Sequence, residues 1–496
     1  MSDTRATPSS PEIDKPAVNA VELVPPPALA ALSEAEYACL ARRATLKLDL
    51  IIMPCVVIMY ILNYLDRQNI ASAKLASIQQ DLRLTDVQYQ TCISLLFVGY
   101  ILMQVPSNMI AGKTRYPGVY ICGAMCLWGL ISACTAAVRD FTGLVLSRFF
   151  LGFVEAAFFP GALFYLSLFY SRKQFAFRTA ILYAGSQLGN AFGGLFAIAI
   201  LKLDGTHGLE GWRWLFLVEG VATIGFAALF AVILPNGLHS IRGFTTLERE
   251  WLQWNFGQDQ GQQDNADEIS AWKGLVMAVQ DPKTWLLMAI LWSTYVAAAV
   301  TNWFPSVVAT LGYSRNTTYV LTAPPYLLCV VAMMINGFHS DIKRERFLHI
   351  ACPLVITLVA NIIAVSSLNT AARCTPPRHY VAMMLMPGSF YASSIVILSW
   401  ITGSLAQPTA KRAAAIALIN AVCNTPNIWT SYLYYSPPRY LAAFLVNLAA
   451  ASLAIAFTVV TWLYLRRQNA KLDQGLDVGK NGPTAAQLAA GFRYIL

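Results

Sequence analysis

The chain has 496 residues, of which 56% are hydrophobic and 12% are charged, and its mean hydropathy is +0.51. This composition excludes an ordinary water-soluble protein and indicates an integral membrane protein. The net charge of +9 does not come from a basic low-complexity tract, so basic loops beside a membrane explain it better than nucleic-acid binding does.

Residues 1–45 are rich in Pro, Ala and Glu and contain no central apolar segment, which argues against a cleavable signal peptide. We expect a disordered cytoplasmic tail over this range. The ten cysteines fall mostly within apolar runs, where a thiol behaves as a small core residue, and they do not predict a disulfide framework.

Twelve apolar runs of about 17 to 25 residues are each long enough to cross a bilayer as a helix. A polar stretch over residues 235–283 divides them into six plus six. We therefore expect an N-terminal half over 46–234, a cytoplasmic linker, a C-terminal half over 284–466 and a cytoplasmic tail over 467–496. The runs begin near Leu46, Thr91, Tyr116, Phe141, Thr179, Leu215, Trp285, Tyr319, Phe347, Tyr380, Ala413 and Tyr440.

The polar stretch between the halves contains two kinds of signal. Thr245 to Glu248 reads TTLE, the spacing of a capping box, ahead of EWLQW, and it predicts a short interfacial helix. The tract GQDQGQQDNADE over 257–268 is typical of a flexible linker.

Lysine and arginine collect on one side of the predicted spans, which places both termini in the cytoplasm. The acceptor sequon Asn316-Thr317-Thr318 then lies outside, between spans seven and eight, and Asn316 is a candidate glycosylation site. We expect a monomer in the plasma membrane.

The fourth run, from Leu146 to Tyr170, carries two charged residues, Arg148 and Glu155. A charge at membrane depth costs roughly 2.5 to 3.5 kcal/mol on insertion scales, so it normally faces a protein interior or a water-filled path. The seven-residue spacing puts both on nearly one helix face about 10 Å apart, too far to pair comfortably. Each needs a partner elsewhere, either in a buried structural ion pair or in a proton or substrate site.

Two loops at equivalent places in the halves contain related sequences, as in transporters built from repeats. Residues 337–346 read GFHSDIKRER, and residues 112–118 read GKTRYPG. In these loops the chain resembles the major facilitator superfamily, whose G-x-x-x-D-R-x-x-R-type motif recurs in each half. The resemblance implies a conformational latch in the second copy, because the first copy has no acid; its residues are Gly337, Asp341, Arg344 and Arg346.

Five further stretches resemble the fungal anion:cation symporter branch, which includes allantoate, nicotinate and pantothenate permeases. They are NYLDRQN, LGFVEAAFFPGALFYLSLFY, GWRWLFLVEG, DPKTW and PPRY, in that order. The resemblance implies an all-α membrane protein with twelve transmembrane helices in two six-helix bundles around a central cavity. It also implies proton-coupled import of a small organic anion.

The first span contains residues whose chemistry suits an organic anion. Asn63 and Arg67 are four residues apart and share a helix face, and Asp66 is their neighbour. A guanidinium fork suits a carboxylate because it can donate two parallel hydrogen bonds. The alternative is that Asp66 and Arg67 simply mark the solvated end of span one.

In related organic-anion symporters, the matching charged positions serve proton coupling and substrate binding. The resemblance therefore assigns proton coupling to Asp66 and Glu155 and substrate binding to Arg67 and Arg148. We expect Asn63 to join the substrate site. Asn302, Tyr326 and Asn424 are polar or aromatic groups at membrane depth, which form either cavity walls or helix–helix hydrogen bonds.

Three functions remain open: an importer of a carboxylate, an exporter of a metabolite made by a fungal biosynthetic pathway, and a non-transporting nutrient sensor. The chain departs from the branch after Ser399-Trp400, where many members have paired Asn residues and this sequence has Ile-Thr-Gly-Ser. The resemblance therefore does not supply the substrate. No nucleotide-binding loop, metal-ligand cluster or nucleophile motif is present, so we expect no enzyme, metal or cofactor.

Overall fold

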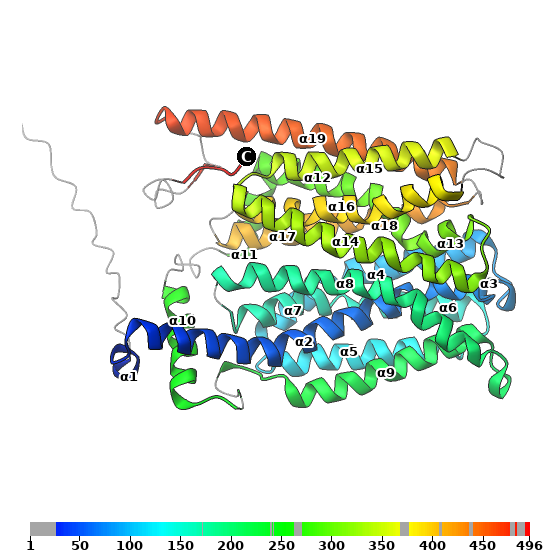
Figure 1. Cartoon of the computed structure of the whole chain (residues 1–496), viewed down its shortest axis with the longest axis horizontal. Coiled ribbons are helices and arrows are strands. Elements are labelled where there is room, and N and C mark those ends of the chain that lie inside the picture. Colours follow the sequence, from blue (N-terminus) through cyan, green and yellow to red (C-terminus); the bar gives the residue numbers. More distant parts are fainter. Residues whose placement is uncertain are drawn as a thin grey trace, which may run out of the picture.

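The computed structural model describes residues 26–170, 172–238, 241, 243–261, 270–367, 376–405, 409–435, 440–476, 482–483 and 492–496. Across these ranges the structure consists of helices and connecting loops, with no β-strand. The long helices run roughly along one direction in two layers, one from each half of the sequence (Figure 1).

The N-terminal half consists of six spans. They are α2 (Glu34–Leu75), α4 (Asp86–Lys113), α5 (Pro117–Thr135), α6 (Phe141–Glu155) followed by α7 (Phe158–Ser167), α8 (Arg172–Ile200) and α9 (Gly211–Ile233). Short elements lie in its connections: α1 (Pro27–Ala30), α3 (Ile78–Asp81), η1 (Leu201–Leu203) and η2 (Thr206–Gly208).

The C-terminal half has the same number of spans. They are α12 (Pro282–Ala297), continued by η5 (Ala298–Trp303) and α13 (Phe304–Ala309), then α14 (Arg315–Lys343), α15 (Phe347–Ser367), α16 (Pro376–Ser404), α17 (Thr409–Asn424) with α18 (Pro426–Trp429) and η6 (Thr430–Leu433), and α19 (Leu441–Asp473). Between the halves lie α10 (Thr246–Gly261) and α11 (Ala271–Val279).

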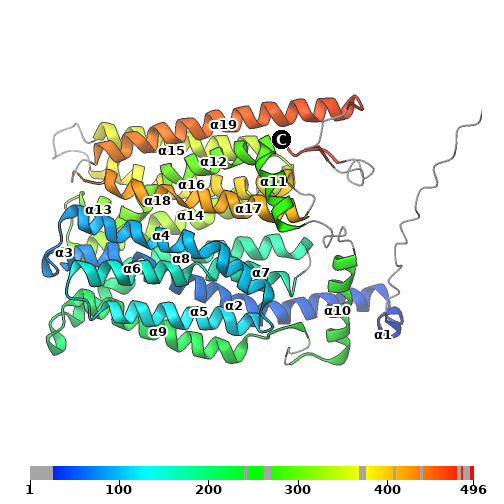
Figure 2. The same ribbon diagram turned by 180° about the vertical axis from the view of Figure 1, so that it is seen from behind.

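Ten spans within the described residues are long and apolar enough to cross a membrane. The other two predicted positions are occupied by α4 and by α17 with α18. The prediction of an all-α membrane protein with two six-helix bundles is confirmed. Helices α1, α10 and α11 and the segment 492–496 lie at one end of the molecule, here called the linker end; α3 marks the opposite end (Figures 1 and 2).

The prediction of a disordered tail over 1–45 is wrong for its last part. Helix α2 begins at Glu34, where Ser33 and Glu36 form a reciprocal capping box: Ser33 N–H donates to Glu36 Oε2 at 3.0 Å, and Glu36 N–H donates to Ser33 Oγ at 3.4 Å. Helix α1 covers 27–30. Residues 1–25 lie outside the described part of the chain.

The interfacial helix predicted from TTLE is present as α10. Thr245 N–H donates to Glu248 Oε2 at 2.9 Å, and Glu248 N–H donates to Thr245 Oγ1 at 3.3 Å. The helix continues to Gly261, so residues 257–261 are helical and not part of a flexible linker, because the capped helix extends into the polar tract. Residues 262–268 of that tract lie outside the described residues.

Several spans are interrupted near mid-length, and proline explains two of the breaks. Pro160 has no N–H for the carbonyl of Ala156, and α6 ends at Glu155, directly before that residue. Pro426 likewise cannot bond the carbonyl of Val422, and α17 ends two residues earlier than Pro426. Interrupted helices at membrane depth leave backbone groups free to bind a ligand, so these breaks point to the region in which a site is to be sought.

Candidate functional site

A polar cavity lies between the two halves, and residues of both line it. From the N-terminal half come Tyr60, Asn63, Tyr64, Arg67, Gln68, Phe97, Tyr100, Glu155, Phe159 and Tyr183; from the C-terminal half come Tyr295, Ala298, Thr301, Asn302, Tyr391, Ser394, Asn420, Asn424 and Asn427. Aromatic rings and side-chain amides dominate this lining, and Arg67 and Glu155 supply its charges.

Helix α2 presents one continuous face to the cavity. Tyr60, Asn63, Tyr64 and Arg67 follow the spacing i, i+3, i+4, i+7, which places them along one stripe of a helix. Arg67 is therefore part of the cavity wall and not a solvated marker at the end of the span. Its guanidinium carbon lies 4.9 Å from the ring centroid of Tyr100 and 5.4 Å from that of Tyr64.

Arg67 and Glu155 form an ion pair across the wall. Arg67 donates to Glu155 Oε2 from Nε at 2.9 Å and from Nη2 at 2.8 Å. Glu155 is buried, and its Oε1 has no hydrogen-bond partner among the described residues. The two charges of span four thus do not pair with each other, as predicted from their spacing.

Arg148 lies behind this pair and does not line the cavity. Its Nη2 donates to the backbone oxygen of Arg67 at 2.8 Å, while Nε and Nη1 have no partner in the described structure. A buried guanidinium beneath Arg67 adds positive charge to this wall. Contact between Arg148 and a substrate remains a prediction.

Asp66 turns away from the cavity into the N-terminal half. It is fully buried and accepts hydrogen bonds from Ser132 Oγ at 2.7 Å and from Thr223 Oγ1 at 2.9 Å. Its proton-coupling role also remains a prediction, and the structure separates Asp66 from the Arg67–Glu155 pair.

The C-terminal half contributes amides and rings. Asn302 Nδ2 donates to Asn427 Oδ1 at 2.9 Å, and Asn424 Nδ2 donates to the backbone oxygen of Asn420 at 2.8 Å. Asn302 and Asn424 both line the cavity; Asn302 also makes a hydrogen bond between two spans, whereas the hydrogen bond of Asn424 stays within α17. Tyr326 instead packs against Phe304, with ring centroids 5.1 Å apart, and does not line the cavity.

Sequence reasoning missed the tyrosines. Tyr64 shares a face with Asn63 and Arg67, so its helical spacing could have identified it. Tyr100, Tyr183, Tyr295 and Tyr391 come from four other spans, and no local pattern in the sequence distinguishes them from ordinary core aromatics.

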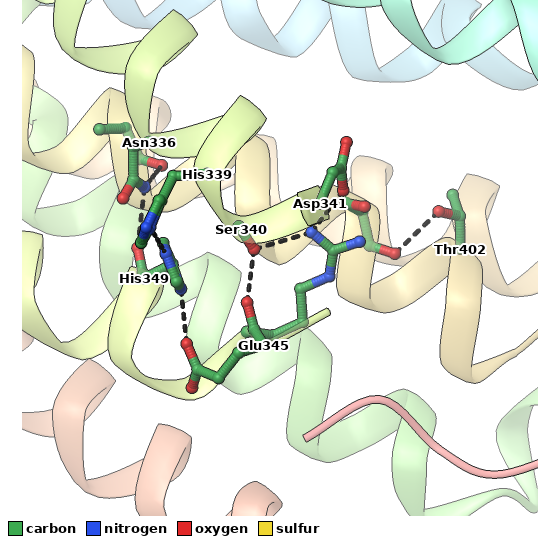
Figure 3. Close-up of polar contacts among 10 residues, drawn as sticks. Asn336, His339, Ser340, Asp341, Glu345, His349 and Thr402 are labelled. Atoms are coloured by element: carbon green, nitrogen blue, oxygen red, sulfur yellow. Dashed lines mark hydrogen bonds and ion pairs between the residues drawn. The ribbon is translucent and has the colours of Figure 1, made fainter. Parts of the chain in front are cut away.

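The predicted latch lies at the turn between α14 and α15. Asp341 Oδ1 accepts from Arg346 Nη1 at 2.7 Å, and the same guanidinium nitrogen donates to Ser340 Oγ at 2.8 Å (Figure 3). Arg344 has a left-handed backbone, with φ of 50°, and ends α14. Gly337 lies one helical turn before Asp341 in α14. The structure thus brings Asp341 together with Arg346, whereas Arg344 shapes the turn.

Asn316 lies in the first turn of α14, and its side chain is exposed at the end opposite the linker end. This position is compatible with glycosylation, which remains a prediction.

The family model of the Major Facilitator Superfamily matches residues 56–431. An uncharacterised transporter of Schizosaccharomyces pombe is 31% identical over 463 residues, covering 91% of this chain and 89% of the relative. The high-affinity nicotinic acid transporter of Saccharomyces cerevisiae is 26% identical over 440 residues, which cover 88% of this chain and 80% of the relative.

Solved structures agree on the fold. The proton:xylose symporter XylE superposes with a TM-score of 0.61 at 16% identity, covering 84% of this chain and 95% of the symporter. A bacterial homologue of the human lysosomal transporter Spinster, in an inward-facing and unoccupied conformation, also superposes with a TM-score of 0.61 at 16% identity. The match covers 83% of this chain and 94% of the homologue. The chain therefore belongs to the Major Facilitator Superfamily and is a membrane transporter, not an enzyme.

Proposed function

We propose that this transporter carries a small carboxylate together with protons, and that Arg67 and Glu155 form the centre of its site. The observation that carries the proposal is the ion pair in the cavity wall. A protein carboxylate holds the only guanidinium among the described lining residues, so a substrate carboxylate and Glu155 compete for the same donors.

Protonation of Glu155 removes the charge that binds Arg67. The guanidinium then has free donors for an anion, and Arg67, whose side chain is only 13% exposed, favours an anion because no other charge in the described cavity lining neutralises it. When the proton leaves, Glu155 again competes for Arg67 and expels the anion. Binding of proton and substrate is thereby coupled through one guanidinium.

The rest of the lining supports a ring-bearing acid as the substrate. Eight aromatic side chains and five asparagines are among the described residues that line the cavity, a combination that can stack on a planar ring and donate hydrogen bonds to its polar edge. A relative that transports nicotinic acid is compatible with this chemistry. We propose import across the plasma membrane, with the linker end in the cytoplasm.

The test uses purified protein in proteoliposomes with an inward proton gradient. A panel of aromatic and aliphatic carboxylates of equal charge is added, and internal pH and substrate uptake are recorded. We expect acidification triggered by a subset of aromatic acids, loss of binding and uptake in Arg67→Ala, and counterflow without gradient-driven accumulation in Glu155→Gln. Exposed Arg139→Ala and Glu34→Gln are the matched controls.

Accumulation that stays pH-dependent in Glu155→Gln contradicts the proton role of this residue. Uptake of neutral compounds in preference to every acid contradicts the carboxylate as substrate. Net movement only out of the vesicles, with either gradient, favours the export alternative.

A further inference from the structure

A second pair of acids lies inside the N-terminal half, away from the cavity. Asp66 on α2 accepts hydrogen bonds from Ser132 on α5 and Thr223 on α9. Glu219 is four residues before Thr223 on α9, so the two side chains share the face that meets α2. Neither Asp66 nor Glu219 is among the residues that line the cavity.

Glu219 has no ordinary partner for its charge. Its side chain is 5% exposed, and neither carboxylate oxygen has a hydrogen-bond partner among the described residues. Two groups of α2 face Glu219: the carboxyl group of Asp66 and, one turn later, the amide of Asn69. The amide makes no hydrogen bond of normal geometry in the described structure, and because it is neutral it cannot balance the charge of a carboxylate.

Within the described part of the chain, the surroundings contain acids and hydroxyl groups but no ion-pairing cation. Neither Asp66 nor Glu219 forms an ion pair in the described structure, and the adjacent Arg67 is bound to Glu155 on the cavity side. Trp128 and Ser132 face Asp66 from α5, and Glu155 on α6 is the further acid whose charge reaches it. Two close buried carboxylates without a cation cannot both be ionised at low cost.

We propose that Asp66 and Glu219 form a proton-binding site that holds one proton between the two carboxyl groups, separate from the Arg67–Glu155 pair. Ser132 and Thr223 donate to Asp66, which favours Asp66 as the ionised member and Glu219 as the member that carries the proton. A protonated Glu219 can donate its O–H to a neighbouring oxygen, which satisfies a carboxyl group that otherwise has no partner.

The position of the pair connects it to the transport site. Asp66 and Arg67 are consecutive residues of α2. A change in the charge of Asp66, on the face inside the N-terminal half, therefore acts on Arg67, the proposed anion-binding residue on the cavity face. Asn69 and Ser72 place further buried polar groups on α2 between this pair and the end opposite the linker end. Only this link between the pair and anion transport rests on the proposed function; the binding of a proton by Asp66 and Glu219 does not.

The first experiment measures the proton directly, without transport. Infrared spectra of the purified full-length chain are recorded as a function of pH, because a protonated carboxyl group has a C=O stretch that a carboxylate lacks. We expect a buried carboxyl band at neutral pH that is lost in Glu219→Gln, since the remaining Asp66 has two donors and ionises. The band must persist in Glu34→Gln, which removes an exposed carboxyl from α2. An undiminished band in Glu219→Gln overturns the proposal.

A second variant tests the pair in case Glu219→Gln does not fold. Thr223→Val keeps both carboxyl groups and removes the O–H that donates to Asp66. The proton is then expected to move toward Asp66, which has become the more basic of the two carboxyl groups, and the protonated band should change in frequency. A band unchanged from the wild type overturns the assignment of the proton to Glu219.

Transport by the same variants separates the two proposals. If the proton on this pair moves with the substrate, Glu219→Gln keeps counterflow but accumulates less substrate, by about tenfold for each unit of the pH gradient. Uptake that is independent of protons in the wild type contradicts the proposed function, while the infrared result still decides whether Asp66 and Glu219 bind a proton.

Discussion

The two hydrogen bonds from Arg67 end on the same oxygen of Glu155, which leaves Oε1 unpaired. The Arg67 guanidinium also lies over the rings of Tyr64 and Tyr100. Its donors are therefore oriented before an anion arrives, and pre-orientation lowers the entropy cost of binding. Lysine carries the same charge but cannot present a planar fork.

We expect Arg67→Lys to raise the KM for the carboxylate by about tenfold or more, because one charge-assisted hydrogen bond contributes roughly 1.5–3 kcal/mol. The maximal rate should change less than KM, since the charge remains. Uptake at several substrate concentrations measures both values, with Arg139→Lys at an exposed position as the control. A lower maximal rate at unchanged KM is incompatible with a role in binding.

Among the elements, α4 and α6 approach each other at a glycine. A Cβ on Gly152 would lie 1.9 Å from the backbone oxygen of Leu96, a distance that no side-chain rotation can relieve. The backbones must therefore separate if this residue is enlarged, and overpacking of this kind typically costs about 1–3 kcal/mol.

Gly152→Ala is accordingly expected to lower the melting temperature of the detergent-purified protein and to reduce transport, because Glu155 is on the same helix. Gly123→Ala is the matched control, since nothing lies within 4 Å of a Cβ built on Gly123 in α5. Equal melting temperatures for the two variants would show that α4 and α6 can separate freely.

Helix α10 is attached to α2 through one acid. Glu248 Oε1 lies 2.8 Å from Lys47 Nζ and 3.3 Å from Arg43 Nε, and its other oxygen caps α10. Burial raises the pKa of Glu248, but the hydrogen bonds from Lys47 and Thr245 and the charges of Lys47 and Arg43 outweigh it, so the pKa lies below its ordinary value.

A lowered pKa in the folded state means that this attachment contributes stability above the ordinary pKa of a glutamate and loses it as pH falls through the lowered value. We expect hydrogen exchange at the backbone amides of α10 to accelerate in that acidic range. Glu248→Gln should exchange faster already at neutral pH, whereas Glu250→Gln on the same helix should not. Identical protection in both variants would exclude Glu248 as the attachment.

Sequence patterns predicted the elements wherever a local rule decides. The capping box at Thr245 is one case; the same signal occurs at Ser33, but there the Pro- and Ala-rich composition before it predicts disorder and conflicts with the local rule. The site was predictable in part: helical spacing placed Asn63 and Arg67 on one face. The partner of Glu155 lies 88 positions away on α2, and no spacing rule connects residues of different helices.

At the scale of the whole molecule, the two halves meet along α8 and α14 and at the end opposite the linker end. There Tyr319 Oη donates to the backbone oxygen of Ser72 at 2.7 Å, and the hydroxyls of Thr91 and Tyr432 are 3.0 Å apart. Gly194 permits this approach, since its Cβ would lie 2.7 Å from the backbone oxygen of Tyr319. Alternating access requires these contacts to break when that end opens.

A reversible cross-link between Thr91→Cys and Tyr432→Cys is therefore expected to stop transport. In a background without native cysteines, a short disulfide-forming bifunctional reagent should join the two thiols, and uptake should fall to the level of empty vesicles. Reduction should restore it, because the block is a tether between halves and not damage to the cavity. Each single-cysteine variant treated identically is the control. Full uptake by the cross-linked protein would mean that this end need not open, and substrate would then have to reach the cavity by another route.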